Sequence, residues 1–211
     1  MPRLTDHDLL EGLLGTGEAA PPDRESRLRL LRLLLQRYSL SPKYLGEPGP
    51  THEELQVMAA AALRAPDHGK LIPFRFVVAS GEGLERLAEL FVDYGRRRGR
   101  SGDDLEAERR KALQAPVVVA VIARIDTSQP EVPAHDQWAC VGGAISNAIM
   151  SLHLMGYGAK MLSGARAEDP RIVAAYCRPG EQLVGWISTG TPKAEPLHRG
   201  DVDPDTVLSR F

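Results

Sequence analysis

Charged and titratable side chains gather in one short stretch of the sequence, between residues 64 and 76. Asp67, His68 and Lys70 lie within four residues, after Pro66, which prevents a helix from continuing, and before strand-forming residues that start at Phe74. Polar groups on a loop between a helix and a strand can converge on a ligand. The pattern predicts either a ligand-binding loop or a solvated surface loop that contains one histidine.

A helix must position this loop, and its start is encoded locally. Thr51 and Glu54 have the spacing of a capping box, and apolar residues follow at helical spacing. Arg64 falls in the last turn, where a cation meets the partial negative charge of a helix C-terminus. We therefore expect Arg64 and His68 to lie at the end of this helix.

Other helices and strands are expected around this unit. Leucines recur among arginines from about Asp23 to Arg37, which predicts an amphipathic helix. Similar patterns predict helices over residues 84–94, 103–114, 137–155 and 170–176. The run from Ala115 to Ala123 is β-branched and almost wholly apolar, as in a central strand covered on both faces. Further strands are expected over residues 74–79, 159–164 and 182–188.

This alternation predicts a layered α/β or α+β domain with about four strands. Residues 1–26 mix acids, glycine and proline and are expected to form an N-terminal extension that is mobile or packed on a partner, and residues 27–211 to form one domain. No GxGxxG or Walker pattern follows an expected strand, so Rossmann and P-loop folds have no motif support.

Bulk composition excludes several classes of partner. A net charge of −2 and a pI near 6.3 give no general attraction to nucleic acid or to an anionic membrane. The longest apolar run, Ala115 to Ala123, is too short to cross a bilayer as a helix. Cys140 and Cys177 are far apart and have no metal-binding spacing, which fits a reducing cytoplasm.

Three separated motifs resemble one known family. They are Arg37-Tyr38-Ser39, the loop from Arg64 to Phe76, and Gly156-Tyr157-Gly158 leading to Ser163-Gly164. Their order and spacing resemble the FMN-dependent nitroreductases, particularly the short, minimal subgroup of NAD(P)H nitroreductases. The resemblance covers about residues 28–193. It implies an α+β nitroreductase-like fold with a central mixed sheet flanked by helices, assembled as an intertwined homodimer.

The resemblance also implies a set of residues that bind FMN. Arg37 and Ser39, with Tyr38 between them, would contact its phosphate and ribityl side, where a guanidinium fork suits phosphate oxygens. Arg64 and His68 would contact the flavin and stabilise its anionic reduced form. The ring would lie along Met161, Leu162 and Ser163, and Lys193 would supply a second phosphate cation. Each of these residues also has a purely structural interpretation, as a solvated cation, a core residue or a structural histidine.

The resemblance implies an oxidoreductase with a ping-pong mechanism. NADH or NADPH would deliver hydride to FMN and leave, and a small-molecule acceptor such as a nitroaromatic or quinone would then take the electrons. The flavin supplies the chemistry, so no catalytic side chain is expected. Three alternatives stay open: a flavin reaction on a dedicated metabolite, a non-catalytic FMN-binding storage or sensing protein, and a plain α/β ligand-binding domain without flavin.

The loop departs from the family's pattern at three positions. Many relatives have an Asn, a Gln and a Trp where this chain has Lys70, Ile72 and Phe74. The polar contacts to the ring and the stacking of substrate are therefore expected to differ.

Overall fold

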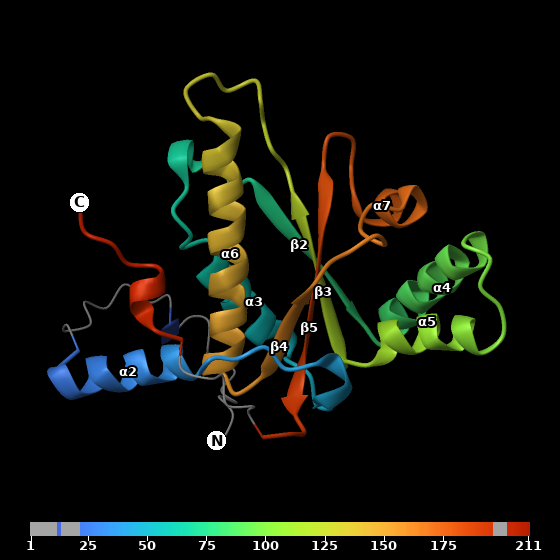
Figure 1. Ribbon diagram of the computed structural model, residues 1–211, viewed down its shortest axis with the longest axis horizontal. Helices are drawn as coiled ribbons and strands as arrows, with labels where there is room; N and C mark the ends of the chain where they lie inside the picture. Colours follow the sequence, from blue (N-terminus) through green and yellow to red (C-terminus); the bar gives the residue numbers. More distant parts are fainter. Residues whose placement is uncertain (1–11, 14–21, 196–201) are drawn as a thin grey trace.

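The computed structural model describes residues 12–13, 22–195 and 202–211 (Figure 1). Most of the extension predicted over residues 1–26 lies outside the described residues. Its last part overlaps the first turn of α2 (Arg24–Gln36), which Asp23 caps by accepting a hydrogen bond from the Ser26 N–H at 2.7 Å.

Five strands form one sheet in the centre of the molecule (Figure 1). They are β1 (Leu45–Gly46), β2 (Phe74–Ser80), β3 (Val117–Ala123), β4 (Gly158–Leu162) and β5 (Gln182–Pro192). The spatial order is β2-β3-β5-β4, and the two-residue β1 pairs with the last residues of β5. The four strands that the sequence predicts are all present, and β1 is an addition.

The α+β class is confirmed, but the sheet is antiparallel at every described pairing rather than mixed. A pair of packed helices, α4 (Glu82–Arg97) and α5 (Asp103–Leu113), connects β2 to β3 and returns the chain to the end of the sheet that it left. β3 and β4 run in the same direction, but β5 lies between them. No parallel pair therefore forms among the described strands.

Helices cover both faces of the sheet. α3 (His52–Ala62) and α6 (Ala134–Leu154) pack on one face, and α4, α5 and α7 (Pro170–Tyr176) pack on the other (Figure 1). All seven residues of β3 are buried; Val119 and Val121 face the α3–α6 core, and Val118 and Ala120 face the α4–α5 core. The expected central strand is confirmed, because its period of two supplies an apolar side chain to each core.

The leucines of α2 do not pack into either core. No residue of this helix is buried, and Leu31, Leu34 and Leu35 expose 53%, 50% and 80% of their surface. α2 runs along the base of α6, where His153 Nε2 lies 3.1 Å from the Leu33 carbonyl (Figure 1). The exposed leucines of this amphipathic helix are available to a covering surface, and isolated short helices are marginal in water.

The small residues of α6 are divided between the two sides of the helix. Ala144 and Ala148 are buried in the chain's own core, and a side chain on Gly143 would meet Ala65. Gly142 is exposed, and a side chain there would meet no described atom within 4 Å. Among these four small residues, Gly142 is the one that faces outward.

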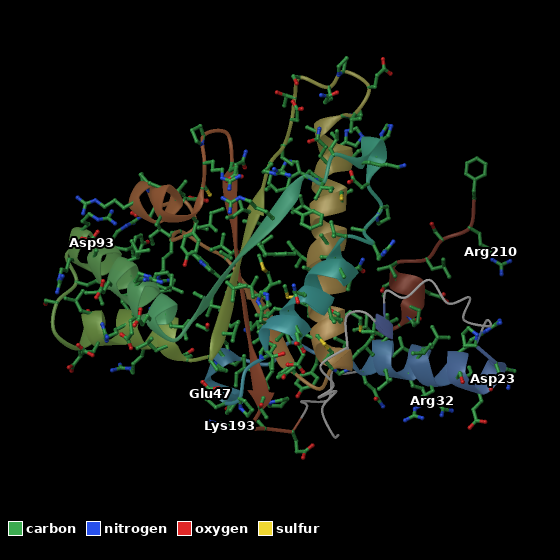
Figure 2. The ribbon with its side chains drawn as sticks, turned by 180° about the vertical axis from the view of Figure 1, so that it is seen from behind. Asp23, Arg32, Glu47, Asp93, Lys193 and Arg210 are labelled. Atoms are coloured by element: carbon green, nitrogen blue, oxygen red, sulfur yellow. The ribbon has the colours of Figure 1, made fainter. Side chains whose placement is uncertain are left out.

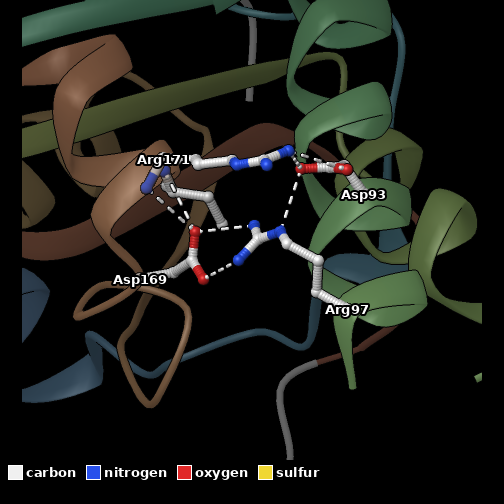
Figure 3. A network of polar contacts seen from close by, with 5 residues as sticks. Asp93, Arg97, Asp169 and Arg171 are labelled. Carbon is white, nitrogen blue, oxygen red and sulfur yellow. Dashed lines mark hydrogen bonds and ion pairs between the residues drawn. The ribbon is translucent and has the colours of Figure 1, made fainter. Parts of the chain in front are cut away.

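A cluster of ion pairs joins α4 to the start of α7 (Figure 3). Arg97 donates to both oxygens of Asp169, at 2.6 and 2.9 Å, and to Asp93 at 3.1 Å. Asp169 also caps α7 by accepting from the N–H groups of Arg171 and Ile172. The hydrogen bonds from Arg97 lower the pKa of Asp169 to about 2, against the opposing effect of burial.

We expect Asp169→Asn to destabilise the protein by about 1–2 kcal/mol at pH 7. Asparagine keeps an oxygen that can cap α7, but it loses the negative charge that pairs with Arg97. The lowered pKa contributes stability that is present above about pH 4 and is lost as the pH falls toward 2. Denaturant unfolding at pH 7, 4 and 2.5 should therefore show the two proteins converging at low pH. Asp104→Asn, at an exposed position, is the control. A constant difference between wild type and Asp169→Asn across this range contradicts the assignment.

No helix in the described part of the chain has both the length and the apolar character that crossing a bilayer requires.

Candidate functional site

A short segment follows α2 and carries several polar side chains. Arg37 and Ser41 both have polyproline-like backbone angles, and the buried Leu40 donates its N–H to the Ala159 carbonyl of β4 at 3.2 Å. Arg37 and Ser41 are partly buried, and Ser39 is exposed. The segment therefore places a guanidinium and two hydroxyls beside the edge strand β4.

The end of this segment, at Ser41, borders a cavity of about 280 Å³ between the sheet and the α4–α5 pair. Ser41 lies at one side, and Leu162 and Ser163 at the end of β4 line another. The floor is apolar and includes Phe91 and Trp186. Three cations from different elements also line the cavity: Lys111 of α5, Lys160 of β4 and Arg166 of the loop before α7.

Glu108 holds two of these cations in place. Its side chain is fully buried and accepts hydrogen bonds from Lys111 at 2.6 Å, from Arg166 Nε at 2.8 Å and from Arg100. Burial acts to raise the pKa of Glu108, but these hydrogen bonds outweigh it, so the pKa is lowered. The Arg166 guanidinium also lies 5.2 Å from the Phe91 ring centroid. One carboxylate thus serves three cations, and the cavity keeps an excess of positive charge.

The Nε1 atom of Trp186 in the cavity wall is buried without a hydrogen-bond partner in the described part of the chain, and Lys160 and Ser188 also lack one. Lys160 makes no ion pair or hydrogen bond through its side chain to another described residue. Ser188, opposite Lys160 in the β4–β5 register, is only 4% exposed, and its hydroxyl has no hydrogen-bond partner in the described part of the chain. A buried polar group normally has a partner. An anionic, polar ligand would supply one to both side chains.

Met161 lies on the other face of β4 from Lys160 and Leu162. It packs against the α3–α6 core and is partly buried. Gly185 of β5 makes room for this arrangement, since a side chain there would meet the Leu162 carbonyl and the Met161 side chain, and its φ of +149° suits glycine. Met161 therefore does not line the cavity that Leu162 and Ser163 form.

A second cavity, of about 570 Å³, lies at the C-terminal end of α6. Tyr38 and Lys193 line it together with His153. Lys193 sits at the end of β5, close to Glu47 in the view of Figure 2, and donates its N–H to the Tyr44 carbonyl at 2.8 Å. Burial lowers the pKa of His153, and the nearby Arg37 lowers it further. Tyr38 and Lys193 are thus close to Arg37, but they face a different cavity from Ser41.

His68 lies at the other end of α6. Its side chain is exposed, and its Nδ1 is 2.8 Å from Asp136 Oδ2 in the first turn of that helix. Arg64 is also exposed, but its neighbours contact the middle of α6, where Asn147 donates to the Ala61 carbonyl and a side chain on Gly143 would meet Ala65. His153, next to Arg37, is in the last turn. The two turns are roughly 25 Å apart along the helix axis. A single FMN cannot contact Arg37 and His68 of the same chain.

The loop residues that differ from the family's pattern have distinct roles in the fold. Phe74 is 5% exposed and belongs to the α3–α6 core. Lys70 and Ile72 have positive φ angles of 55° and 47°. Phe74 is therefore a core residue rather than a surface on which a substrate stacks.

The polar cavity residues that were not predicted from the sequence include Ser41, Lys111, Lys160 and Arg166. Two of them carry a detectable signal. Ser41 continues the alternation of Arg37 and Ser39, and Lys160 is the one charged residue in β4. Lys111 and Arg166 look like ordinary surface cations in sequence, and packing alone brings them together.

The fold and the site together define an α+β protein whose cation-lined cavity, beside the edge strand β4, suits an anionic cofactor. A model of the nitroreductase family matches residues 34–191. The chain is 34% identical over 183 residues to the Escherichia coli protein named "Putative NAD(P)H nitroreductase YdjA", covering 86% of this chain and 98% of that one. This chain belongs to the nitroreductase family, a family of oxidoreductases, and the resemblance predicted from its motifs is confirmed.

Solved structures show the same fold. A nitroreductase-like family protein from Bacillus cereus superposes with a TM-score of 0.71 at 16% identity, covering 92% of this chain and 99% of that one. A nitroreductase from Desulfovibrio desulfuricans, solved in complex with FMN, superposes with a TM-score of 0.65 at 16% identity, covering 86% and 96%.

Proposed function

We propose that this protein is an FMN-dependent oxidoreductase of nitroreductase type, which transfers reducing equivalents from NADH or NADPH to a small-molecule acceptor by a ping-pong mechanism. The observation that carries the proposal is the cation-lined cavity beside β4, which Ser41 borders at the end of the segment that carries Arg37 and Ser39. When bound, FMN would supply the hydride-transfer chemistry.

The residues present fit this cofactor. The Arg37 guanidinium and the Ser39 hydroxyl offer donors to a phosphate. Lys111, Lys160 and Arg166 would place positive charge where an isoalloxazine ring gains negative charge on reduction. Two of these side chains need not reorient, because Glu108 already holds them.

A cavity of about 280 Å³ is slightly below the usual range of roughly 300–1,000 Å³ for ligand sites. It would enclose part of FMN and leave the rest to other surfaces.

A second copy of the chain would supply those surfaces. His68 is too far from Arg37 to share one FMN within a chain, and the leucines of α2 are uncovered. A homodimer in which Arg64 and His68 of one subunit approach the flavin of the other accounts for both observations. Its two FMN sites would lie between the subunits.

The side chains would bind and orient rather than exchange protons. None of the predicted FMN-binding residues needs to act as an acid or base, because the acceptor can take its protons from water. A nitroaromatic or a quinone is the acceptor class that we propose. A cytoplasmic location stays a prediction from the cysteine pattern.

An anaerobic titration tests the proposal. The purified protein is expected to be yellow, to carry close to equimolar FMN, and to lose its colour when NADH or NADPH is added. Subsequent addition of a quinone or nitroaromatic should restore the colour. A colourless protein that binds no added FMN contradicts the proposal. A yellow protein that neither nucleotide bleaches is instead a flavin-binding storage or sensing protein.

A further inference from the structure

Two rows of side chains cross the sheet at the floor of the cavity beside β4. Lys160 of β4 and Ser188 of β5 are paired in the antiparallel register, so their side chains lie on the same face of the sheet. Two residues further along β4, Leu162 is paired with Trp186 in the same way. All four residues line the cavity. The floor therefore has a polar row and an apolar row, roughly 7 Å apart along the strands.

The polar row has a positive charge that no carboxylate balances. Lys111 and Arg166, the other cations of the cavity, both donate to the buried carboxylate of Glu108, at 2.6 and 2.8 Å. The Lys160 ammonium has no such partner among the described residues. The Ser188 hydroxyl beside it, on a residue that is 4% exposed, also lacks a hydrogen-bond partner in the described part of the chain. An ammonium and a hydroxyl side by side in a partly enclosed position suit an oxyanion.

The apolar row offers a surface for a flat group. The rings of Trp186 and Phe91 meet edge to face with their centroids 5.5 Å apart, and both residues line the cavity. Leu162 extends this surface to the edge strand β4. An aromatic ring packs well on such side chains. The volume of about 280 Å³ favours a molecule with one ring over a polycyclic one.

We propose that Lys160 and Ser188 form an anion subsite that binds the carboxylate of a single-ring aromatic acid, whose ring lies over Trp186 and Leu162. A carboxylate attached directly to a ring spans the two rows. The binding site itself needs no flavin. Its role as the site of the electron acceptor rests on the proposed function, because the ring end of the acid would point along β4 toward Ser163, where the flavin is predicted to lie.

Reduction of such an acid would leave its carboxylate unchanged. With para-nitrobenzoate, one NADH or NADPH and one proton convert the nitro group to a nitroso group, and the oxidised nucleotide and water are released. Both electrons come from the nicotinamide, and neither Lys160 nor Ser188 gives up a proton. The two residues bind and orient the acid.

Benzoate and its uncharged isostere benzamide test the subsite without turnover. Calorimetric titration of the purified protein should show benzoate binding about tenfold tighter than benzamide, as expected for one charge-assisted contact to a partly exposed lysine. Lys160→Met keeps an unbranched apolar side chain and should abolish this preference. Ser188→Ala should weaken benzoate binding by a smaller factor, about threefold, because the ammonium remains.

Lys43 provides a matched control. It lies two residues beyond Ser41 of the cavity wall, but it is exposed, its Nζ lies 4.7 Å from the Tyr44 ring centroid, and it does not line the cavity. Lys43→Met should keep the preference for benzoate. In turnover, the ratio of kcat/KM for para-nitrobenzoate to kcat/KM for para-nitrobenzamide should fall about tenfold in Lys160→Met and stay unchanged in Lys43→Met. Melting temperatures check that each variant is folded.

The outcomes separate this inference from the proposed function. Equal affinity for benzoate and benzamide in wild type, or a preference that survives Lys160→Met, overturns the anion subsite whether or not the protein carries FMN. Benzoate that displaces FMN shows that Lys160 and Ser188 serve the cofactor instead, which also overturns it. A colourless protein whose preference for benzoate depends on Lys160 supports the binding site, but it overturns the acceptor role together with the proposed function.

Discussion

Replacing Leu31 and Leu35 of α2 by glutamate is expected to convert the proposed homodimer into a monomer that does not retain FMN. Both leucines are more than half exposed in the single chain, so the change should hardly affect folding of the subunit. A subunit interface that covers them would instead have to bury two charges on each side. Desolvation of unpaired charges is costly, and the subunits are expected to separate.

The size of the effect follows from the symmetry of a dimer. Each substitution occurs in both subunits, so four leucine surfaces are lost. The part of each leucine side chain that is still exposed in the single chain would contribute about 1 kcal/mol when the interface covers it. Losing four such contributions costs about 4 kcal/mol, which raises the dissociation constant of the dimer close to a thousandfold. FMN should be released together with the partner, because Arg64 and His68 of that subunit complete its site.

Light scattering and the flavin absorbance of the same fractions would measure both effects. Val78→Glu is a suitable control. Val78 is 45% exposed on β2, which forms the opposite edge of the sheet from β4. It should remain dimeric and yellow. A Leu31→Glu, Leu35→Glu protein that is monomeric and fully loaded with FMN would reject the shared site, and one that is still dimeric would reject α2 as the interface.

Arg37→Ala is expected to weaken FMN binding by about ten- to a hundredfold. Arg37 is half-buried at the C-terminus of α2, at the start of the segment whose Ser41 borders the cavity. One charge-assisted hydrogen bond to a phosphate is worth roughly 1.5–3 kcal/mol. Arg37→Lys should recover only part of this affinity, because an ammonium lacks the planar pair of donors that matches phosphate oxygens.

Melting temperatures with and without FMN measure this loss. The apo proteins should melt at similar temperatures, since a helix-end arginine adds little stability by itself, and FMN should stabilise wild type more than the variant. Arg32→Ala is the matched control, because Arg32 is exposed on the same helix and extends away from the site (Figure 2). Equal FMN-induced shifts for wild type and Arg37→Ala across a range of FMN concentrations would remove Arg37 from the site.

The sequence alone determined the secondary structure and the family. The capping box of Thr51 and Glu54 is present with both hydrogen bonds, and α7 spans the expected residues 170–176. These features are local, since a cap or an apolar period depends on residues within a few positions of one another. The family motifs are similarly short. The assignment of the predicted FMN residues is still a prediction, because no bound cofactor tests it.

Tertiary structure decided what these segments bring together. β1 exists because the end of β5 offers it a partner, and the sheet is antiparallel because β5 separates the two strands that run in the same direction. Lys111, Lys160 and Arg166 meet in one cavity only because α5, β4 and the loop before α7 pack around the same space. The length of α6 separates His68 from Arg37 and makes a second subunit necessary for the proposed site. Such contacts join residues many positions apart, and no local pattern encodes the packing that creates them.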